Sequence, residues 1–457
     1  MRMVLKHKSL ILWLAYVLIV QSYLLISHSK SIIKRLPGYH GDLHFKLETG
    51  YVGVGDKEEV QLFYYFVEST NNSEEDPLIF YIPGGPGASA LVTFFLEIGP
   101  VSSTSDDNNN LTLALNQYAW TQMANIIFID IPAGTGFSYS ETKQGWISSD
   151  TNLAILATDF IKKFLTEHPK FKKNPLYIAG ISYIGIIVPK ITLDLYESNE
   201  RGDQPTLNIQ GYILCSPFTN KFEDFNSRFK YAHRNALISD DIYMSAIKNC
   251  QGNFVSTYSA NSFCASSLQM YEECTSRINL DNILEPFCDE NDPIQDCDND
   301  SYIETWANTD IVQQALHVRQ GKVGKWELIN QTLHYNQGKN DTFCYSYDIF
   351  SSYSYHKKLS TKNCRALIFS GDQDMTFPYV GVEEWITALN VGVEVPWKPF
   401  YVDGQVGGYQ TKYAENEYSL TFATVKGAGH LVPLTKPKES IALVQRWFNS
   451  QPYVSDY

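Results

Sequence analysis

Ser182 follows a short apolar run at residues 176–179 that is typical of a buried strand, and apolar, helix-compatible sequence comes after it. Gly180 and Gly185 lie on either side of the serine. Glycines there permit a sharp strand-to-helix turn, which exposes the hydroxyl and points the N-terminus of the next helix at it. The stretch therefore predicts Ser182 as a nucleophile, with an ordinary glycine-serine turn as the alternative.

A serine nucleophile needs a base, and the base needs a third group to orient it. Both are found at the ends of two late apolar runs. Residues 366–369 lead to Asp372 and Asp374, and residues 422–425 lead to His430 in a glycine-rich loop. Catalytic groups of parallel sheets gather at the carboxyl ends of the strands, so we expect these side chains at one edge. The order Ser, Asp, His is that of the α/β-hydrolases.

Asp372 and Asp374 compete for the orienting role, since both follow the same apolar run. We favour Asp374, because the extra turn beyond the strand suits a reach across to a histidine in another loop. A lone histidine among glycines is more often structural, but together with a serine and an aspartate it becomes a candidate base. The predicted triad is Ser182, Asp374 and His430.

The oxyanion that forms when a serine attacks a carbonyl requires two preorganised hydrogen-bond donors. One candidate is the backbone N–H of Tyr183, at the start of the next helix. The other is the N–H of Gly85, in the glycine loop at 84–87 that directly follows the apolar run at 78–82. Such a loop can also be a bare turn, but its place after a buried strand favours a role in the site.

The elements that must position these groups alternate between strands and helices. Apolar residues from 153 to 165 recur at helical spacing, and residues 441–448 form a second amphipathic pattern near the end of the chain. This alternation predicts an α/β fold with a mostly parallel sheet and helices on both faces. Residues 30–70 are expected to add antiparallel strands at one sheet edge. The other predicted strands are 78–82, 126–129, 176–179, 209–214, 366–369 and 420–425.

The pattern changes from about residue 221 to 345, where polar helical segments and six of the eight cysteines occur. We expect this segment to be a disulfide-linked cap inserted over the sheet, within one hydrolase domain at 30–457. The acidic run at 289–300 is expected to be solvated surface.

Composition excludes several function classes. The 457-residue chain is 44% hydrophobic and carries a net charge of -14, so it is globular and would be repelled by nucleic acid. The histidines are scattered and the cysteine spacings are not those of zinc sites. The glycine loop also lacks the Lys-Ser/Thr of a phosphate-binding loop. We therefore expect no metal, cofactor or nucleic-acid partner; the oligomeric state is open.

Residues 1–29 combine basic residues, an apolar run and serines, which is the layout of a secretory signal peptide. A retained membrane anchor is the alternative. After cleavage we expect no membrane association, and residence in the secretory pathway, as a secreted or vacuolar protein. Five glycosylation sequons fit that compartment: Asn71, Asn110, Asn299, Asn330 and Asn340.

The chain resembles the plant type of serine carboxypeptidase-like proteins over nearly all of its length after the leader. Beside the Ser182 turn, the stretches that carry the resemblance are LPGY at 36–39, ETGYVGV at 48–54, PLIFYIPGGPGAS at 77–89, DIPAGTGFSYS at 130–140, ALISD at 236–240, WAN at 306–308, SGDQDMTFP at 370–378 and GAGHLVP at 427–433. The resemblance implies an α/β-hydrolase fold with a helical insertion, and the triad and oxyanion hole given above.

Two branches of that family are relevant. The segments at 50–55 and 405–409 look most like the acyltransferase branch, which moves an acyl group from a 1-O-β-glucose ester to an alcohol or amine. The other branch removes C-terminal residues from peptides. The substrate-binding candidates are Gly84, Pro83 and Ile181. Ile181 stands where peptidases of the family have Glu and acyltransferases have Asp, and Pro83 where the family has Asn or Thr. Both changes remove polar groups.

The cysteines also depart from the family. The family's cysteine in the glycine loop is Ala88 here, and its usual partner is Ile329, so one bridge is missing at both ends. Cys215 is expected to be a buried thiol. For the others we favour the pairs Cys250 with Cys264 and Cys288 with Cys297, and Cys344 with Cys364 is a possible replacement bridge.

Three functions remain open. The leading one is an acyltransferase that takes a small-molecule acyl donor, a glucose ester, and an acceptor. The second is a serine-type carboxypeptidase acting on peptide C-termini, which the loss of polar groups at positions 83 and 181 disfavours most. The third is a catalytically silent member of the family that acts by binding.

Overall fold

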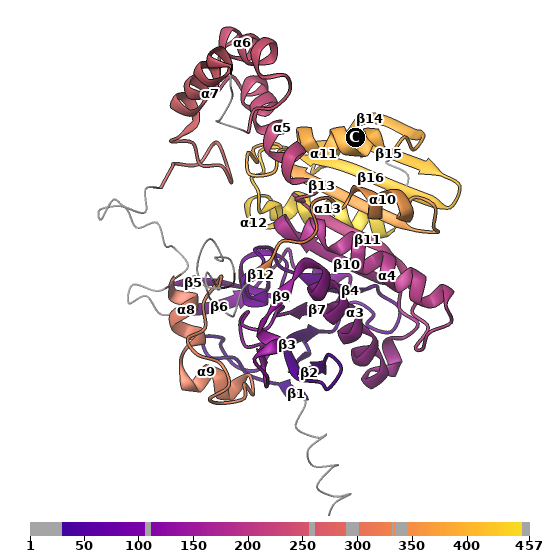
Figure 1. Ribbon diagram of the computed structural model, residues 1–457. Helices are drawn as coiled ribbons and strands as arrows, with labels where there is room; N and C mark the ends of the chain where they lie inside the picture. Colours follow the sequence, from indigo (N-terminus) through magenta and orange to yellow (C-terminus); the bar gives the residue numbers. More distant parts are fainter. Residues whose placement is uncertain are drawn as a thin grey trace, which may run out of the picture.

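The computed structural model describes residues 30–105, 111–255, 261–288, 301–330, 333 and 345–449. A twisted twelve-stranded sheet runs through the molecule (Figure 1), in the order β1-β2-β3-β7-β4-β10-β11-β13-β16-β15-β14, with β8 beside β3. The strands are β1 (Lys30–Ile33), β2 (Leu47–Val54), β3 (Val60–Val67), β4 (Leu78–Ile82), β7 (Asn125–Ile129), β8 (Tyr139–Ser140), β10 (Leu176–Ile181), β11 (Ile209–Cys215), β13 (Arg365–Gly371), β14 (Val393–Val402), β15 (Gln405–Glu415) and β16 (Tyr418–Val425).

The centre of the sheet, from β7 to β16, is parallel throughout. Its strands are buried on both faces, which is why they appear in the sequence as continuous apolar runs. The N-terminal strands β1 to β3 add antiparallel pairs at one edge. The predicted α/β fold and every predicted strand are confirmed. The antiparallel pair β14 and β15 at the other edge was not predicted.

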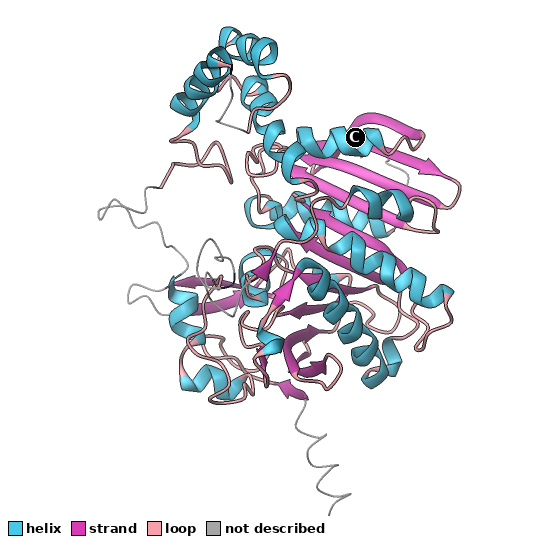
Figure 2. Ribbon diagram, in the orientation of Figure 1, coloured by secondary structure: helices cyan, strands magenta, loops and turns pink. Residues whose placement is uncertain are grey.

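Helices cover both faces of the sheet (Figure 2). On one face lie α3 (Asp150–Glu167), α4 (Val188–Glu200) and α11 (Tyr379–Ala388), and on the other lies α13 (Pro437–Phe448). Helix α3 has the predicted amphipathic face, with Leu153, Phe160 and Phe164 fully buried, and it begins at Ser149, whose hydroxyl accepts the N–H of Asn152. Such an N-cap satisfies one of the free donors at a helix start.

The segment predicted as one cap divides into two parts. Helices α5 (Lys221–Arg234), α6 (Asp240–Cys250) and α7 (Ser262–Thr275) project beyond the sheet and share their own hydrophobic cluster. Helices α8 (Ser301–Ala307) and α9 (Asp310–Ala315) lie instead beside the hairpin of β5 (Val101–Ser105) and β6 (Leu111–Leu115) (Figure 1). The buried apolar residues of these two helices belong to the main core instead, and the indole of Trp306 packs 5.1 Å from the ring of Phe95.

The described cysteines agree with the predicted pairing in part. Cys250 and Cys264 form a disulfide that links α6 to α7, as predicted. Cys288 is also disulfide-bonded, but its predicted partner Cys297 lies outside the described residues, as does Cys344. The pairing of Cys344 with Cys364 is wrong, because Cys364 is a free thiol. It is fully buried just before β13, where burial raises its pKa to about 12.

Two of the five sequons fall on described residues. Asn71 is exposed, whereas Asn330 is half-buried and donates its Nδ2 to the carbonyl of Gly134 at 2.6 Å, a contact that a glycan would displace. Asn110, Asn299 and Asn340 lie outside the described residues, and so does the predicted signal peptide at 1–29. Within the described ranges, every helix is too short or too polar to cross a membrane.

Candidate active site

Ser182 stands at the turn between β10 and the 3-10 helix η5 (Ser182–Ile186), which leads into α4. Its φ is +62°, a left-handed conformation that a non-glycine residue adopts only at a cost. Glycines make the tight turn possible: a Cβ at Gly180 would lie 2.7 Å from the side chain of Ile184, and one at Gly185 would lie 2.4 Å from Pro217. The predicted strand-to-helix turn therefore exists, with the serine strained and partly exposed at its apex.

The glycine loop after β4 passes directly against this serine. A Cβ on Gly84 would lie 2.9 Å from the Cβ of Ser182 and 3.4 Å from its Oγ. Gly85 has a φ of +110°, which is open to glycine and strained for other residues. The loop is thus close enough for its backbone to face a group bound to Ser182. The assignment of the Gly85 and Tyr183 N–H groups as an oxyanion hole stays a prediction.

Backbone hydrogen bonds connect the glycine loop and the residues that follow it to residues 328–330. The N–H of Ser89 donates to Leu328 and the N–H of Asn330 donates to Gly87, at 2.8 and 3.0 Å. Between these bonds Ala88 and Ile329 face each other as an isolated antiparallel pair. These are the two positions at which the family's bridge is absent, so hydrogen bonds alone connect the loop to this segment.

A disulfide introduced at this pair is expected to form and to stabilise the loop. Residues opposite each other in an antiparallel pair have Cα atoms about 4.5–5.5 Å apart, which suits a disulfide. The double variant Ala88→Cys with Ile329→Cys should oxidise spontaneously and gain about 2–4 kcal/mol of unfolding free energy. Thiol counting and thermal melts with and without reductant measure this, with Ala88→Cys alone as control. Two more titratable thiols in the oxidised double variant than in the native chain, which itself has free cysteines, would contradict it.

His430 and Asp374 are in direct contact. The Nδ1 of His430 lies 2.9 Å from Oδ2 of Asp374, which is fully buried. The other carboxylate oxygen, Oδ1, accepts the N–H groups of Thr376 and Phe377 at 2.8 and 3.1 Å. A carboxylate fixed in this way holds the imidazole in one orientation, with Nε2 facing away from the aspartate.

Asp372, the competing candidate, does not contact the imidazole. Its Oδ1 accepts the N–H of Gly427 at 2.7 Å and the side-chain amide of Gln373 at 2.9 Å, so it ties down the loop that carries His430. The hydroxyl of Ser182 makes no hydrogen bond to His430, although the structure describes both residues. Catalytic hydrogen bonds are often long in the unliganded state and tighten when substrate binds.

Burial opposes the charged form of His430, but the charge and hydrogen bond of Asp374 outweigh it, and Asp281 and Glu97 add to the effect. Together these groups raise the pKa of His430 above its ordinary value. Asp281 comes from the segment after α7, and its backbone carbonyl accepts the N–H of His430 at 2.6 Å. The cap thus supplies both a contact and a charge to the candidate base.

The pH dependence of the reaction rate is expected to show the effect of the Asp281 charge on His430. His430 accepts a proton only when neutral, so kcat/KM should rise with pH through an apparent pKa above the ordinary value. Asp281→Asn removes one negative charge and should move that rise to lower pH. The pH dependence of the rate at which a phosphonate probe labels Ser182 measures it, with the exposed Glu285→Gln as control. Identical profiles for the two variants would contradict the assigned influence of Asp281.

Sequence reasoning missed two acidic residues near the site. Glu97 ends the π-helix η1 (Thr93–Glu97), is 4% exposed, and accepts from the hydroxyls of Thr93 and Tyr81 at 3.2 and 3.4 Å. Burial raises its pKa to about 7. Asp150, at the start of α3, accepts from the hydroxyl of Tyr183 at 2.6 Å and so fixes the residue after the serine. The sequence did contain a signal for Glu97: it is the single acidic residue in the largely apolar stretch at 93–98, which indicates a buried carboxyl group.

Of the three substrate-binding candidates, Gly84 lies against the serine, and the substrate-binding role of all three stays a prediction. Ile181 is 2% exposed and packs in the core, and Pro83 is buried before the glycine loop. Neither side chain offers a hydrogen bond there. Cys215 is a buried free thiol with a pKa raised far above the ordinary value by burial, as expected of a non-catalytic cysteine. Within the described ranges, no three His, Cys, Asp or Glu side chains cluster as a metal site would require.

Comparison with known proteins gives consistent matches over nearly the full chain. Residues 37–450 match the family model described as serine carboxypeptidase. Serine carboxypeptidase-like 2 of Arabidopsis thaliana is 40% identical over 449 residues, covering 97% of this chain and 98% of the relative. Serine carboxypeptidase-like 16 of the same plant is 42% identical over 446 residues, covering 96% and 99%.

A solved structure shows the same fold at low sequence identity. Kex1(delta)p, a prohormone-processing carboxypeptidase from Saccharomyces cerevisiae, superposes with a TM-score of 0.71 at 19% identity, covering 89% of this chain and 92% of that chain. Identity this low supports the shared architecture and carries nothing about substrate.

Proposed function

Since the chain belongs to the serine carboxypeptidase family, α/β-hydrolases that work through a Ser-His-Asp mechanism, we propose that it acts as an acyltransferase. Its donor is a 1-O-β-glucose ester and its acceptor an alcohol or amine. The proposed roles are those predicted above: Ser182 is the nucleophile, His430 the base and Asp374 the orienting acid. The contact of His430 with Asp374, at the sheet edge where Ser182 follows the end of β10, is the observation that carries the acyl-enzyme step.

The proposed reaction has two halves. In the first, Oγ of Ser182 attacks the ester carbonyl while Nε2 of His430 takes its proton, and the N–H groups of Gly85 and Tyr183 stabilise the oxyanion. Glucose leaves with the proton from His430, and the acyl group stays on Ser182. In the second half, His430 deprotonates the acceptor, which attacks the acyl-enzyme and releases the serine. Asp374 holds Nδ1–H throughout.

The apolar surroundings of the serine favour transfer over peptide cleavage. A carboxypeptidase must hold the free carboxylate of the peptide C-terminus, and a hydrogen bond to a charged group contributes about 1.5–3 kcal/mol. Pro83 and Ile181 supply none, so losing two such bonds weakens carboxylate binding by a factor of roughly several hundred or more. An ester of a neutral sugar makes no such demand.

The leader at 1–29 and the described disulfide support a place in the secretory pathway, secreted or vacuolar. Disulfides such as that of Cys250 and Cys264 persist in oxidising compartments.

The proposal is tested in two steps on the purified full chain. First, an active-site phosphonate should label Ser182 and should fail on Ser182→Ala; absence of labelling on the native chain would favour a silent, ligand-binding protein. Second, the enzyme is incubated with a panel of acylglucoses with and without acceptors, and with blocked dipeptides. We expect glucose release only when an acceptor is present. Release of C-terminal amino acids from the dipeptides would overturn the proposal in favour of a carboxypeptidase.

A further inference from the structure

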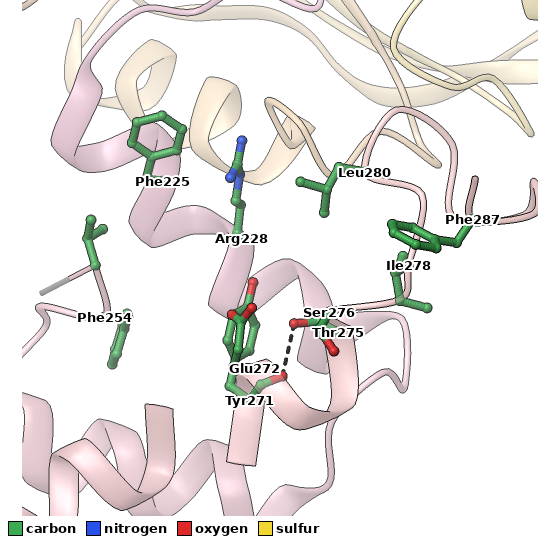
Figure 3. Close-up of a pocket in the computed structure, with 11 residues that line it drawn as sticks. Phe225, Arg228, Phe254, Tyr271, Glu272, Thr275, Ser276, Ile278, Leu280 and Phe287 are labelled. Atoms are coloured by element: carbon green, nitrogen blue, oxygen red, sulfur yellow. Dashed lines mark hydrogen bonds between the residues drawn. The ribbon is translucent and has the colours of Figure 1, made fainter. Parts of the chain in front are cut away.

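A cavity of about 480 Å³ lies inside the cap, between α5, α7 and the chain that follows α7 (Figure 3). Four aromatic side chains line it: Phe225, Phe254, Tyr271 and Phe287. This volume is within the range of sites that take small organic molecules, and the lining suits a flat apolar ring.

A cation projects among these aromatic side chains. Figure 3 shows Arg228, from α5, between Phe225 and Leu280. Its guanidinium lies 4.6 Å from the centre of the Phe225 ring, and its Nε and Nη2 donate to the carbonyl of Thr376 at 3.1 and 2.7 Å. Those two bonds leave part of the five-donor fork, including Nη1, for another acceptor.

Arg228 has no ion-pair partner within 4.0 Å in the part of the chain that the structure describes. The nearby carboxylates are engaged elsewhere. Asp224 accepts the N–H groups at 219 and 220, Asp281 accepts the hydroxyl of Thr376, and Asp374 holds His430. Glu272 also lines the cavity, but its side chain is exposed to solvent, and water screens its charge. Burial lowers the pKa of Arg228 even though the charges of the nearby carboxylates oppose this shift, so a bound anion would stabilise the charged guanidinium further.

The cavity shares a wall with the loop that carries Asp374. Arg228 bonds to the residue two positions after that aspartate, and the carbonyl of Leu280 accepts the N–H of Met375 at 2.8 Å. Phe377, on the same loop, packs 5.6 Å from the ring of His430. The loop that carries Asp374 therefore contacts both the wall of the cavity and the candidate base, His430.

We propose that this cap cavity binds an aromatic group that carries a carboxylate or another anionic substituent, with the ring among the four aromatic side chains and the anion on the guanidinium of Arg228. Pro83 and Ile181 offer a charged substrate group no hydrogen bond near the serine. We therefore assign the binding of a negatively charged substrate group to Arg228 in the cap. The binding itself does not depend on catalysis. Its consequence, a preference for substrates with an acidic aromatic group, rests on the proposed function.

Binding of two matched probes tests the proposal. Titration calorimetry on the full chain compares 2-naphthoate with 2-naphthamide, which have the same ring system but differ in charge. We expect the carboxylate to bind at least about tenfold more tightly, the size expected for a hydrogen bond to a charged group. Equal affinity for the two probes would overturn the proposal, whatever the protein does to acylglucoses or peptides.

Variants then locate the bound probe. Arg228→Gln should abolish the preference for the carboxylate and Arg228→Lys should retain part of it. Arg234→Gln, in the last turn of the same helix and 4.0 Å from Glu383, should leave it unchanged. Phe287→Ala should weaken the binding of both probes to a similar degree. A preference that survives Arg228→Gln, or affinities unaffected by Phe287→Ala, would place the site elsewhere and refute the inference.

Arg228 also supports the loop at Thr376, so its variants require a control for folding. Thermal melts identify any variant that fails to fold. In that case the native chain and Phe287→Ala still test the proposal. The native chain gives the ratio of the affinities for naphthoate and naphthamide, and Phe287→Ala shows whether both probes bind in the cavity. If naphthoate binds as expected while the phosphonate fails to label Ser182, the proposed function fails and the cavity assignment stands.

Discussion

Ser182→Ala is expected to abolish acyl-enzyme formation and to lower kcat by about 10⁴–10⁶-fold, because a triad without its nucleophile retains only binding and oxyanion stabilisation. Intact-protein mass spectrometry after a phosphonate probe, and glucose release from an acylglucose with acceptor, measure the two effects. Ser262→Ala, exposed at the start of α7, is the matched control and should keep full activity. Labelling of the Ser182→Ala variant at another residue would contradict the assignment.

The strained backbone at this position adds a stability test to the same prediction. At a φ of +62°, alanine carries the same steric cost as serine, so Ser182→Ala should unfold at nearly the native temperature. Ser182→Gly removes that cost and should gain up to about 1 kcal/mol of unfolding free energy while remaining inactive. A glycine variant less stable than the alanine variant would show that the turn is not strained in the way its φ indicates.

The sequence predicted the central part of the fold because its signals are local and strong there. Short continuous apolar runs such as 366–369 are typical of fully buried strands, and the helix at 153–165 has a clean apolar face. The pair β14 and β15 was missed because Pro396, Pro399 and two glycines at 407 and 408 interrupt its strand pattern. The prolines are tolerated because β14 is the edge strand and is paired on one side only, with β15.

The parts of the site that could not be predicted depend on contacts between distant segments. Nothing near Glu97 in the sequence shows that its carboxyl lies among Thr93, Tyr81 and the charge of His430. In the same way, Cys364 has the sequence context of any surface cysteine before a strand, yet it is a free thiol buried in the core. The division of the cap likewise depends on tertiary packing, because α8 and α9 contribute apolar residues such as Trp306 to the main core.

The contacts of the two aspartates after β13 connect the catalytic loop to two different neighbours. Asp374 faces His430 directly, whereas Asp372 bonds to the backbone at Gly427, where the histidine loop begins. One carboxylate therefore acts on the charge and orientation of the imidazole, and the other acts on the position of its loop. Because the two carboxylates act differently, comparing substitutions of Asp374 and Asp372 tests which of them belongs to the triad.

Asp374→Asn is expected to lower kcat by about 10⁴-fold, and Asp372→Asn by less than about tenfold. An asparagine at 374 can still accept the N–H groups of Thr376 and Phe377 through Oδ1, so the loop should keep its shape. Its amide then donates to Nδ1 of His430 and selects the tautomer whose Nε2 carries the proton and cannot accept one from Ser182. An asparagine at 372 keeps the acceptor for Gly427 and changes no group that touches the imidazole.

Single-turnover acylation by an acylglucose, followed with both variants over a range of pH, separates the two roles. The Asp374→Asn variant should acylate slowly at every pH, and its apparent pKa should fall, because Asp374 is the main group that raises the pKa of His430. The Asp372→Asn variant should keep the native pKa. Equal losses in the two variants would mean that the loop, rather than the charge on Asp374, limits the reaction, and the assignment of Asp374 as the orienting acid would then be wrong.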